Sequence, residues 1–389
     1  MFLIDKPYVS DFLIQTIRDH HFEIIATKTA KELIADDSLN WIAEEKALSI
    51  IKNNPQTPVY SNSENALAWI DQHLGESELA RQIKSLKDKA TFRELIANLF
   101  PDFNFKKLTL DAIHKLAPQE LPFPFVIKPA VGFFSIGVHI VKNEADWEKA
   151  KNELKSEKLK SIFPKNVLNT THFIIEDFIE GEEFAIDYYH DHQGNVVLLN
   201  MLHHLFSSAN DTSDRVYSTS KEIIEKHKVR IEAFLNTIGK QLSLKNFPAH
   251  AEVRIDDNGN IIPIEINPLR FGGWCTTADL LGITLGFNLY KCFYEGNKPN
   301  WERIFKGKES KKLSIIILNN NSGIAAPDIL NFDYEALAND FENPVLIREL
   351  DINTYPVFGF VFAETSLQNQ KELNDMLLSD LKKYITAKR

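Results

Sequence analysis

The feature that most constrains this chain is a short polar hairpin, HAEVRIDDNGNIIPIEIN, at residues 250–267. The pair Asn258-Gly259 is the strongest short hairpin signal and is typical of a type I′ turn. With these two residues as the turn, Glu252 faces Glu265 directly across the ladder, with Cβ atoms roughly 4.5–5.5 Å apart. Pro263 falls opposite Arg254, where its missing N–H costs no ladder hydrogen bond.

The alternation of side chains along the two strands predicts one polar face and one apolar face. The polar face carries His250, Glu252, Arg254, Glu265 and Asn267, and the core-facing side of the second strand carries Ile262, Ile264 and Ile266. Like charges directly opposite destabilise a strand pair, and a divalent cation would reverse that repulsion. Two carboxylates and an amide suit Mg²⁺, with Mn²⁺ as an alternative ion. A solvated polar face, neutralised by Arg254 and nearby lysines, fits the same residues.

Composition limits the class of protein. The chain has 389 residues, enough for two or three domains, and is 44% hydrophobic and 25% charged, as expected of a folded soluble protein. We see no apolar run of about 20 residues, no signal peptide and no cysteine pattern typical of disulfides or zinc. We therefore expect a cytoplasmic protein with no membrane partner. The net charge of -10 argues against general nucleic-acid binding.

The order of predicted elements indicates a mixed α/β and α+β architecture. Alternating strands and helices predict a parallel βαβ domain at residues 1–88. Residues 87–100 form a predicted amphipathic helix, and residues 123–141 predict two strands around a glycine-containing loop. Residues 173–206 predict several antiparallel strands. Residues 311–389 predict a small C-terminal α+β extension.

From roughly Lys89 to Gly273, this order of elements resembles the ATP-grasp superfamily, and in particular carboxylate–amine ligases of the L-amino acid ligase and D-alanine–D-alanine ligase type. The resemblance implies an ATP-grasp fold with an N-terminal pre-grasp domain and two grasp subdomains at residues 89–310. One subdomain, at about residues 130–205, would act as a lid. The chain would end in the C-terminal extension at residues 311–389.

The resemblance also implies nucleotide-binding residues. Lys89, in the pair Asp88-Lys89 at a helix start, would contact the phosphates, and Lys128 in VIKPA would contact the α- and β-phosphates. The loop that follows would approach the phosphates through backbone N–H groups. Its matching residues are Gly132, Ser135 and Gly137, whereas Phe133 and Phe134 replace the usual small residues.

The segment IIEDFIEGEEFAID resembles the hinge strand that holds adenine. The backbone of Asp177, Phe178 and Ile179 would contact the base, the region of Glu176 would lie near the exocyclic amine, and Glu183 would hold the ribose hydroxyls. The metal ligands implied by the family are Glu252, Glu265 and Asn267.

Two arginines complete the predicted site. Arg270 lies three residues after Asn267 instead of the usual two, and we expect it to enter the site and bind a carboxylate or the transferring phosphoryl group. Arg254 either neutralises the γ-phosphate or pairs with the two metal-binding glutamates. With Lys128, these arginines are the predicted catalytic residues.

The implied activity is ATP-dependent ligation of a small-molecule carboxylate to an amine through an acyl phosphate, with release of ADP and phosphate. The polar loop at Ser207–Thr219, which contains Asp214, Arg215 and Tyr217, would line the acceptor site or face solvent. Two alternatives remain open: an ATP-grasp carboxylase that uses bicarbonate, and a nucleotide-binding module without turnover. Many family members dimerise, so a homodimer is also expected.

Overall fold

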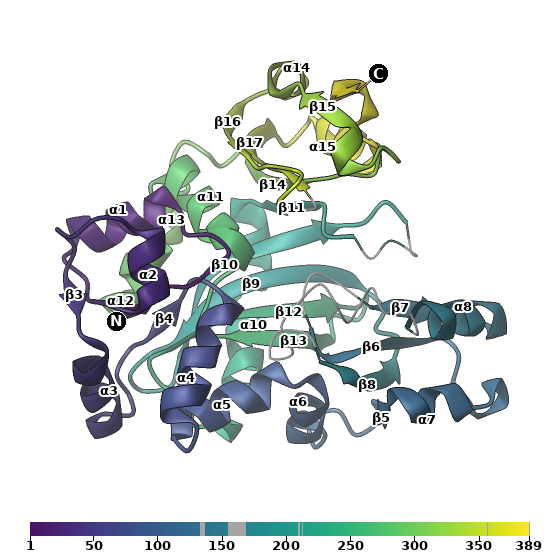
Figure 1. Ribbon diagram of the computed structural model, residues 1–389, viewed down its shortest axis with the longest axis horizontal. Helices are drawn as coiled ribbons and strands as arrows, with labels where there is room; N and C mark the ends of the chain where they lie inside the picture. The colour runs from purple at the N-terminus through teal and green to yellow at the C-terminus, as the bar shows by residue number, and fades with distance from the viewer. Residues whose placement is uncertain (133–136, 155–168, 209–210, 212, 356, 389) are drawn as a thin grey trace.

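The computed structural model describes residues 1–389 except 133–136, 155–168, 209–210, 212, 356 and 389. Its described part contains a small parallel sheet at the N-terminus, a long antiparallel sheet through the centre and a second small sheet beside it (Figure 1). The cavity described below lies where the second small sheet faces the central sheet.

The N-terminal region confirms the predicted parallel sheet, whose order is β3-β2-β1-β4. Its strands are β1 (Phe2–Leu3), β2 (Ile24–Ile25), β3 (Trp41–Ile42) and β4 (Tyr60–Ser61). The helices of this region are α1 (Asp11–Asp19), α2 (Lys28–Leu33), α3 (Glu44–Asn53), α4 (Leu67–Leu74) and α5 (Glu78–Lys87). Ser10 caps α1 by accepting a hydrogen bond from the N–H of Leu13. Strand β3 was not predicted, because two residues are too few to show a period.

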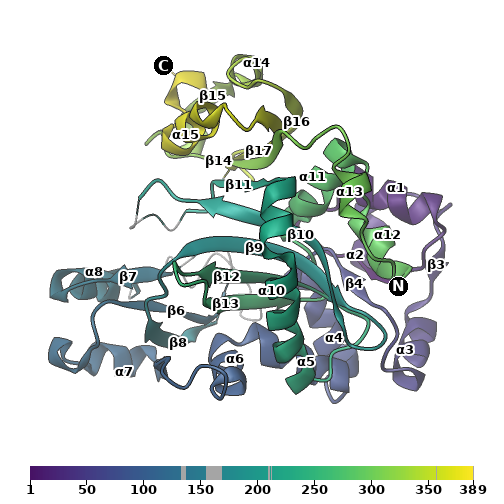
Figure 2. The ribbon, with the colours of Figure 1, turned by 180° about the vertical axis from the view of Figure 1, so that it is seen from behind.

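The central sheet has eight strands among the described residues, in the order β13-β12-β9-β10-β11-β14-β17-β16. They are β9 (Glu182–His190), β10 (Val196–Leu205), β11 (Val216–Thr219), β12 (Phe247–Ile255), β13 (Ile261–Pro268), β14 (Lys311–Asn319), β16 (Pro344–Glu349) and β17 (Val357–Ser366). The long helix α10 (Lys221–Gln241) lies across one face (Figure 2). Its buried Ile231 and Leu235 pack into the same core as Leu198 of β10. The opposite face is thereby free to carry polar side chains.

The second small sheet has the order β5-β8-β6-β7. Its strands are β5 (Phe105–Thr109), β6 (Phe125–Val131), β7 (His139–Val141) and β8 (Asn169–Asp177), and helices α7 (Leu110–Lys115) and α8 (Glu144–Leu154) lie with it. This unit, residues 105–177, differs from the lid expected at about 130–205. The chain leaves the small sheet after Asp177 and enters the central sheet at Glu182, so β9 and β10 are not part of the lid.

The C-terminal residues extend the central sheet, because β14 pairs with β11 and β17 pairs with β14. The two-stranded sheet of β15 (Ile329–Phe332) and β18 (Ile385–Ala387) and helices α14 (Tyr334–Ala338) and α15 (Gln370–Leu378) build a separate core on it. Between the two parts, α11 (Thr276–Leu285), α12 (Leu289–Tyr294) and α13 (Trp301–Ile304) follow β13. Residue 311, the predicted domain boundary, therefore begins strand β14 of the central sheet and does not separate two sheets.

The β12–β13 hairpin has a different turn from the predicted one. Asp256 pairs with Asn260 through N–H···O at 3.1 Å, and in this fully described loop positive φ occurs at Gly259, at 81°. The loop therefore has three residues, a form that carries a glycine bulge. Val253, not Arg254, pairs with Pro263. The predicted pairing of Arg254 with Pro263 is wrong by one residue.

A second irregularity restores the predicted register. Between the pairs Val253–Pro263 and Glu252–Glu265, strand β13 contains one extra residue, Ile264. Glu252 therefore faces Glu265 as predicted. The bulge also turns Ile264 toward the cavity, so its predicted core position is wrong.

Candidate nucleotide-binding site

The first lysine of the site is placed by a helix cap. Asp88 caps α6 (Lys89–Ile96) by accepting hydrogen bonds from the N–H groups of Ala90 and Thr91, at 3.0 and 2.9 Å. Lys89 is then the first helical residue, and its Nζ lies 2.6 Å from Glu265 Oε2 and 3.3 Å from the carbonyl oxygen of Gly132. This lysine connects the carboxylate pair of the central sheet to the loop after β6.

The second lysine belongs to a buried ion network. Lys128 Nζ lies 2.7 Å from Glu176 Oε1, and Arg93 Nε lies 2.7 Å from Glu176 Oε2. Burial alone would raise the pKa of Glu176, but Lys128 and Arg93 outweigh it and bring the pKa to about 2. Arg93 also donates to the carbonyl of Pro263 at 2.6 Å, which ties the network to the edge strand of the central sheet. In this structure the role of Glu176 is therefore to pair with Lys128 and Arg93.

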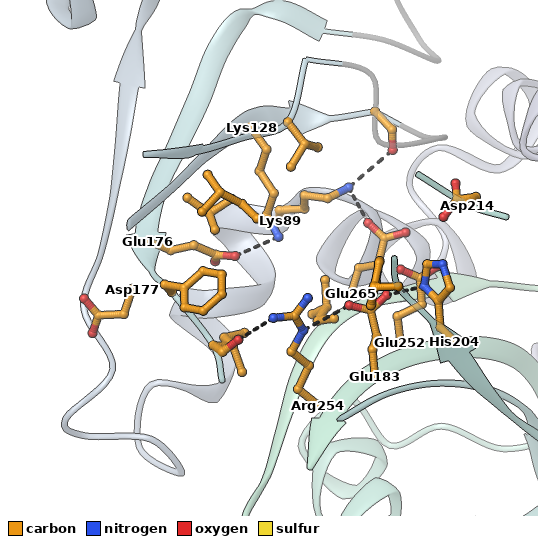
Figure 3. A pocket seen from close by; sticks show the side chains of 18 of the residues that line it. Lys89, Lys128, Glu176, Asp177, Glu183, His204, Asp214, Glu252, Arg254 and Glu265 are labelled. Atoms are coloured by element: carbon orange, nitrogen blue, oxygen red, sulfur yellow. Dashed lines mark hydrogen bonds and ion pairs between the residues drawn. The ribbon is translucent and has the colours of Figure 1, made fainter. Parts of the chain in front are cut away.

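The hinge end of the site contains Asp177, the last residue of β8, and Phe178 and Ile179, which follow it. Arg254 donates to the carbonyl of Ile179 at 2.6 Å and to Glu183 at 3.0 Å, between the rings of Phe178 and Phe206 (Figure 3). The expected ion pair of Arg254 with the two metal-face glutamates is not formed, and its expected contact with the γ-phosphate stays a prediction. The guanidinium holds the hinge carbonyl and Glu183, not the two metal-face glutamates.

Glu183 is held from both sides. In addition to Arg254, His204 Nδ1 lies 2.8 Å from Glu183 Oε1. Burial raises the pKa of Glu183, but His204 and Arg254 together lower it below its usual range. The ring of His204 stacks on Tyr217 at a centroid distance of 4.1 Å. Glu183 is therefore a fixed, ionised acceptor at the predicted ribose position.

The carboxylate pair lies opposite the lysines. Burial, and then the charges of Glu265 and Glu183, raise the pKa of Glu252 well above its usual range. Burial also opposes ionisation of Glu265, but Lys89 reverses this and lowers its pKa to about 2. Two facing carboxylates that disfavour each other's charge match the donor chemistry of a divalent cation site.

Asn267 completes the predicted metal set from the next position of the same face. Its Nδ2 donates to Glu265 Oε1 at 2.9 Å, so its carbonyl oxygen remains available as a ligand. In the part of the chain that the structure describes, no group of three or more His, Cys, Asp or Glu side chains could hold a metal. The predicted set therefore depends on this amide.

One cavity brings most of the predicted residues together. Its predicted lining residues are Lys89, Lys128, Gly132, Glu176, Asp177, Phe178, Ile179, Glu183, Glu252, Arg254 and Glu265. Gly137, with φ of 74°, and Asn267 do not line it. Ser135 lies outside the described residues. The roles of these residues in binding stay predictions.

Arg270 does not line this cavity, contrary to the expectation that it enters the site. Its Nη2 pairs with Glu64 Oε1 at 2.9 Å, and its Nη1 donates to the carbonyl of Phe271 at 3.0 Å. Glu64 lies 206 positions away in the sequence, which explains why the pair could not be foreseen.

The acceptor loop divides into two parts. Asp214 lines the cavity and accepts a hydrogen bond from Tyr217 Oη at 2.7 Å. Arg215 does not line the cavity and is 2% exposed. Its Nε donates to the carbonyl of Met376, and its Nη2 donates to the carbonyl of Ser379. Arg215 thus anchors the loop to the C-terminal core and is not an acceptor-site residue.

Among the residues that the sequence analysis missed are Arg93, the ion-pair partner of Glu176, and Ile264, which lines the cavity. Arg93 had a usable signal, because it follows Lys89 by four residues on α6 and therefore shares its helix face. Ile264 had none, because only the bulge turns it toward the cavity.

Comparison with known proteins agrees with this geometry. Residues 121–278 match the family model of the ATP-grasp domain, so the chain contains an ATP-grasp domain. The resemblance deduced from the sequence is confirmed, and the observed architecture is the ATP-grasp fold.

A more particular similarity is to two proteins that are named as ligases. The alanine–anticapsin ligase of Bacillus amyloliquefaciens is 27% identical over 179 residues, which span 43% of this chain and 38% of that protein. Among solved structures, the L-amino acid ligase from Bacillus licheniformis has a TM-score of 0.67 at 17% identity, over 99% of this chain and 97% of that chain.

The fold extends to enzymes with other names. The N5-carboxyaminoimidazole ribonucleotide synthetase from Thermotoga maritima has a TM-score of 0.62 at 14% identity, over 100% of this chain and 98% of that chain. The biotin carboxylase from Campylobacter jejuni has a TM-score of 0.60 at 14% identity, over 99% and 92%. At these identities the similarity concerns the fold alone.

In the described residues, no helix is both long enough and apolar enough to cross a membrane.

Proposed function

We propose that this protein is an ATP- and magnesium-dependent ligase that joins a carboxylate to an amine through an acyl phosphate, with release of ADP and phosphate. The observation that carries the proposal is the single cavity in which Lys89 and Lys128 face the Glu252–Glu265 pair, with the hinge residues at its end. The similarity to the alanine–anticapsin ligase supports an amino acid as one substrate.

The arrangement of the lining residues suggests how ATP would lie. Adenine would occupy the hinge end, against Phe178, Ile179 and the bulged Ile264, and ribose would reach the fixed carboxylate of Glu183. The phosphates would then extend between Lys128 and Lys89. The backbone at Gly132 would also lie close to the phosphates, because its carbonyl oxygen is 3.3 Å from Lys89 Nζ.

The chemistry needs no protein nucleophile. The substrate carboxylate would attack the γ-phosphorus while Lys89 and Lys128 hold the phosphate oxygens and stabilise their charge in the transition state. Glu252, Glu265 and Asn267 would hold Mg²⁺, which when bound supplies positive charge to the β- and γ-phosphates. The amine would then displace phosphate from the acyl phosphate. The small sheet at residues 105–177 would exclude water by closing on the central sheet.

Asp214 is our candidate for the acceptor side of the cavity. Its carboxylate accepts from Tyr217 Oη, and burial raises its pKa despite the opposing effect of His204. A carboxylate in this position could receive the ammonium group of an amine substrate. We place this residue, and not Arg215, in the acceptor site.

The test is ADP release by the purified protein with ATP and Mg²⁺. The panel would contain amino acids and small carboxylic acids, alone and in pairs, with alanine first and bicarbonate included. Glu265→Gln would be the site variant. Glu349→Gln, an exposed glutamate on the edge strand β16 of the same sheet, would be its matched control.

Release that requires one acid and one amine, and that falls by about 100-fold or more in Glu265→Gln but not in Glu349→Gln, would support the ligase. Release stimulated by bicarbonate alone would favour the carboxylase. ATP binding without release for any pair would contradict the ligase and favour a binding module.

A further inference from the structure

The turn after β13 is held in a strained shape, a few residues beyond the strand that carries Glu265 and Asn267. It begins with Arg270 and runs through Gly272 to Cys275, three to eight residues beyond the metal candidate Asn267. Trp274 and Cys275 both have positive φ, at 58° and 60°. Side chains other than glycine rarely adopt this region, because Cβ then crowds the following carbonyl oxygen. Two such residues in succession need contacts elsewhere to hold them.

One end of the turn is fixed by the central sheet. The N–H of Gly272 donates to Asp187 Oδ1 at 2.9 Å, and the same oxygen lies 2.7 Å from His250 Nδ1. His250 pairs in register with Asn267, one row along the polar face from the Glu252–Glu265 pair. The position of the turn is thereby coupled to the strands that carry the candidate metal ligands.

The other end of the turn is fixed from the C-terminal part of the chain. Arg348, in β16, donates from Nη1 to the carbonyl oxygen of Trp274 at 2.8 Å. Its Nη2 pairs with Asp279 in the first turns of α11, and Asp279 also accepts from Ser10 Oγ at 2.9 Å. One guanidinium therefore joins the strained carbonyl, the following helix and the N-terminal region.

The surroundings of Arg348 make this contact specific. Its side chain is only 8% exposed, and its guanidinium carbon lies 4.6 Å from the ring centroid of Tyr8 and 5.1 Å from that of Phe362. The indole of Trp274 packs on Tyr355 at 4.9 Å and on Phe360 at 5.8 Å. A planar fork that bonds a carboxylate and a carbonyl while stacking on aromatic rings requires arginine and cannot be supplied by lysine.

We propose that Arg348 is a positioning residue that holds the Gly272–Cys275 turn, and through Asp187 and His250 the strands that carry the candidate metal ligands, in the geometry that the substrates require. The substrate part of this inference rests on the proposed ligase function. The inference gives the C-terminal extension a role in substrate recognition that its separate hydrophobic core does not reveal.

The variants must avoid a buried unpaired charge. Burial raises the pKa of Asp279 to about 6 even with Arg348 beside it, so Arg348→Met alone would leave that carboxyl without its partner. We would therefore use Arg348→Lys, which keeps the charge, and the double variant Arg348→Met/Asp279→Asn, which removes both charges. Lys308→Arg is the matched control, because it keeps the charge that pairs with the buried Glu364 in the same part of the chain and, like Arg348→Lys, exchanges one cation for another.

The first readout is amide hydrogen exchange of the full-length protein, measured by mass spectrometry. We expect the peptide that covers residues 271–277 to exchange at least tenfold faster in both Arg348 variants, with no change in peptides that cover Lys128 or Glu176. The Lys308→Arg protein should retain the wild-type rate in that peptide. An unchanged rate in either Arg348 variant, or an equal increase in the control, would overturn the inference.

The second readout is kinetic and uses the acid–amine pair that gives ADP release. We expect KM for the acid or the amine to rise at least tenfold in both Arg348 variants, while KM for ATP stays within twofold of wild type. A fall in thermal stability with unchanged KM values would show that Arg348 only stabilises the fold, and it would overturn the positioning role. If no pair gives turnover with the wild-type protein, the proposed function fails, and the exchange rates still decide whether Arg348 holds the turn.

Discussion

The two walls of the cavity solve the problem of buried charge in opposite ways. On the small-sheet side, Glu176 lies within 2.7 Å of both Lys128 and Arg93, so the charges are paired within the protein. On the central-sheet side, Glu252 faces Glu265 across the ladder. Among the described residues, Lys89 lies 2.6 Å from Glu265, whereas Glu252 has the ring of His250 at 3.9 Å. The first wall is complete by itself, whereas the second has an excess of negative charge that a cation would balance.

This difference separates stability from binding. A wall with internal pairs should depend little on ligands and should lose much stability when one partner is removed. A wall with like charges should respond to ligands and should tolerate, or even gain from, the loss of one charge. The same substitution, glutamate to glutamine, can be made in both walls and compared directly.

The largest expected effect is on the paired wall. Glu176→Gln would leave Lys128 and Arg93 buried without their shared anion, and we expect the free energy of unfolding to fall by about 3–5 kcal/mol. Urea denaturation at pH 7 would measure it. Glu180→Gln, an exposed glutamate four residues later, should change stability by less than about 0.5 kcal/mol. A loss below about 1 kcal/mol in Glu176→Gln would show that the network is not a stabilising pair.

The second effect is the pH dependence of the same wall. Unfolded, Glu176 would titrate near its ordinary pKa of 4.5, whereas in the folded protein its pKa is about 2. Between these values the unfolded state binds more protons, so the stabilisation is complete above pH 4.5 and is lost as the pH falls toward 2. The loss should reach about 3 kcal/mol.

Denaturation curves from pH 6 to pH 2 would measure this dependence. The difference in stability between wild type and Glu176→Gln should stay constant down to about pH 4.5 and shrink between that pH and about 2. A constant difference would mean that the network does not hold Glu176 ionised.

The sequence predicted the two walls unequally. The Glu252–Glu265 pair follows from the hairpin pattern, and Lys89 and Lys128 follow from short motifs that resemble those of the family, so each prediction rests on a local stretch of sequence. The partners of Glu176 and Arg270 do not, since they depend on segments brought together from 83 and 206 positions away. The periodicity of a sequence does not indicate which distant segments meet in the folded protein.

The same reason explains the errors in the fold. The strands after Phe173 show one continuous antiparallel pattern, and only the break at residues 178–181 moves the chain from the small sheet to the central one. The hairpin register was correct at Glu252 because a three-residue loop and the Ile264 bulge offset each other. Neither irregularity can be recognised from the alternation of polar and apolar residues, because the pattern looks the same as in an ordinary strand.

The third effect should appear on the second wall when metal is added. Mg²⁺ at ten times its dissociation constant should stabilise the nucleotide-free protein by about 1.4 kcal/mol. Thermal unfolding with increasing MgCl₂, reversed by EDTA, would measure it at constant ionic strength. The shift should disappear in Glu265→Gln, while Glu349→Gln should keep it. An equal shift in both variants would assign the effect to salt and not to the carboxylate pair.

The smallest effect is the most direct test of the contrast between the walls. Glu252→Gln removes one of two facing carboxylates, and in metal-free buffer at pH 7 we expect it to stabilise the protein by about 0.5–1 kcal/mol. The same chemical change therefore has opposite signs in the two walls, since Glu176→Gln destabilises. Urea denaturation of both variants in EDTA would compare them. A destabilised Glu252→Gln would mean that Lys89 already neutralises both carboxylates, and the second wall would then be complete without a metal.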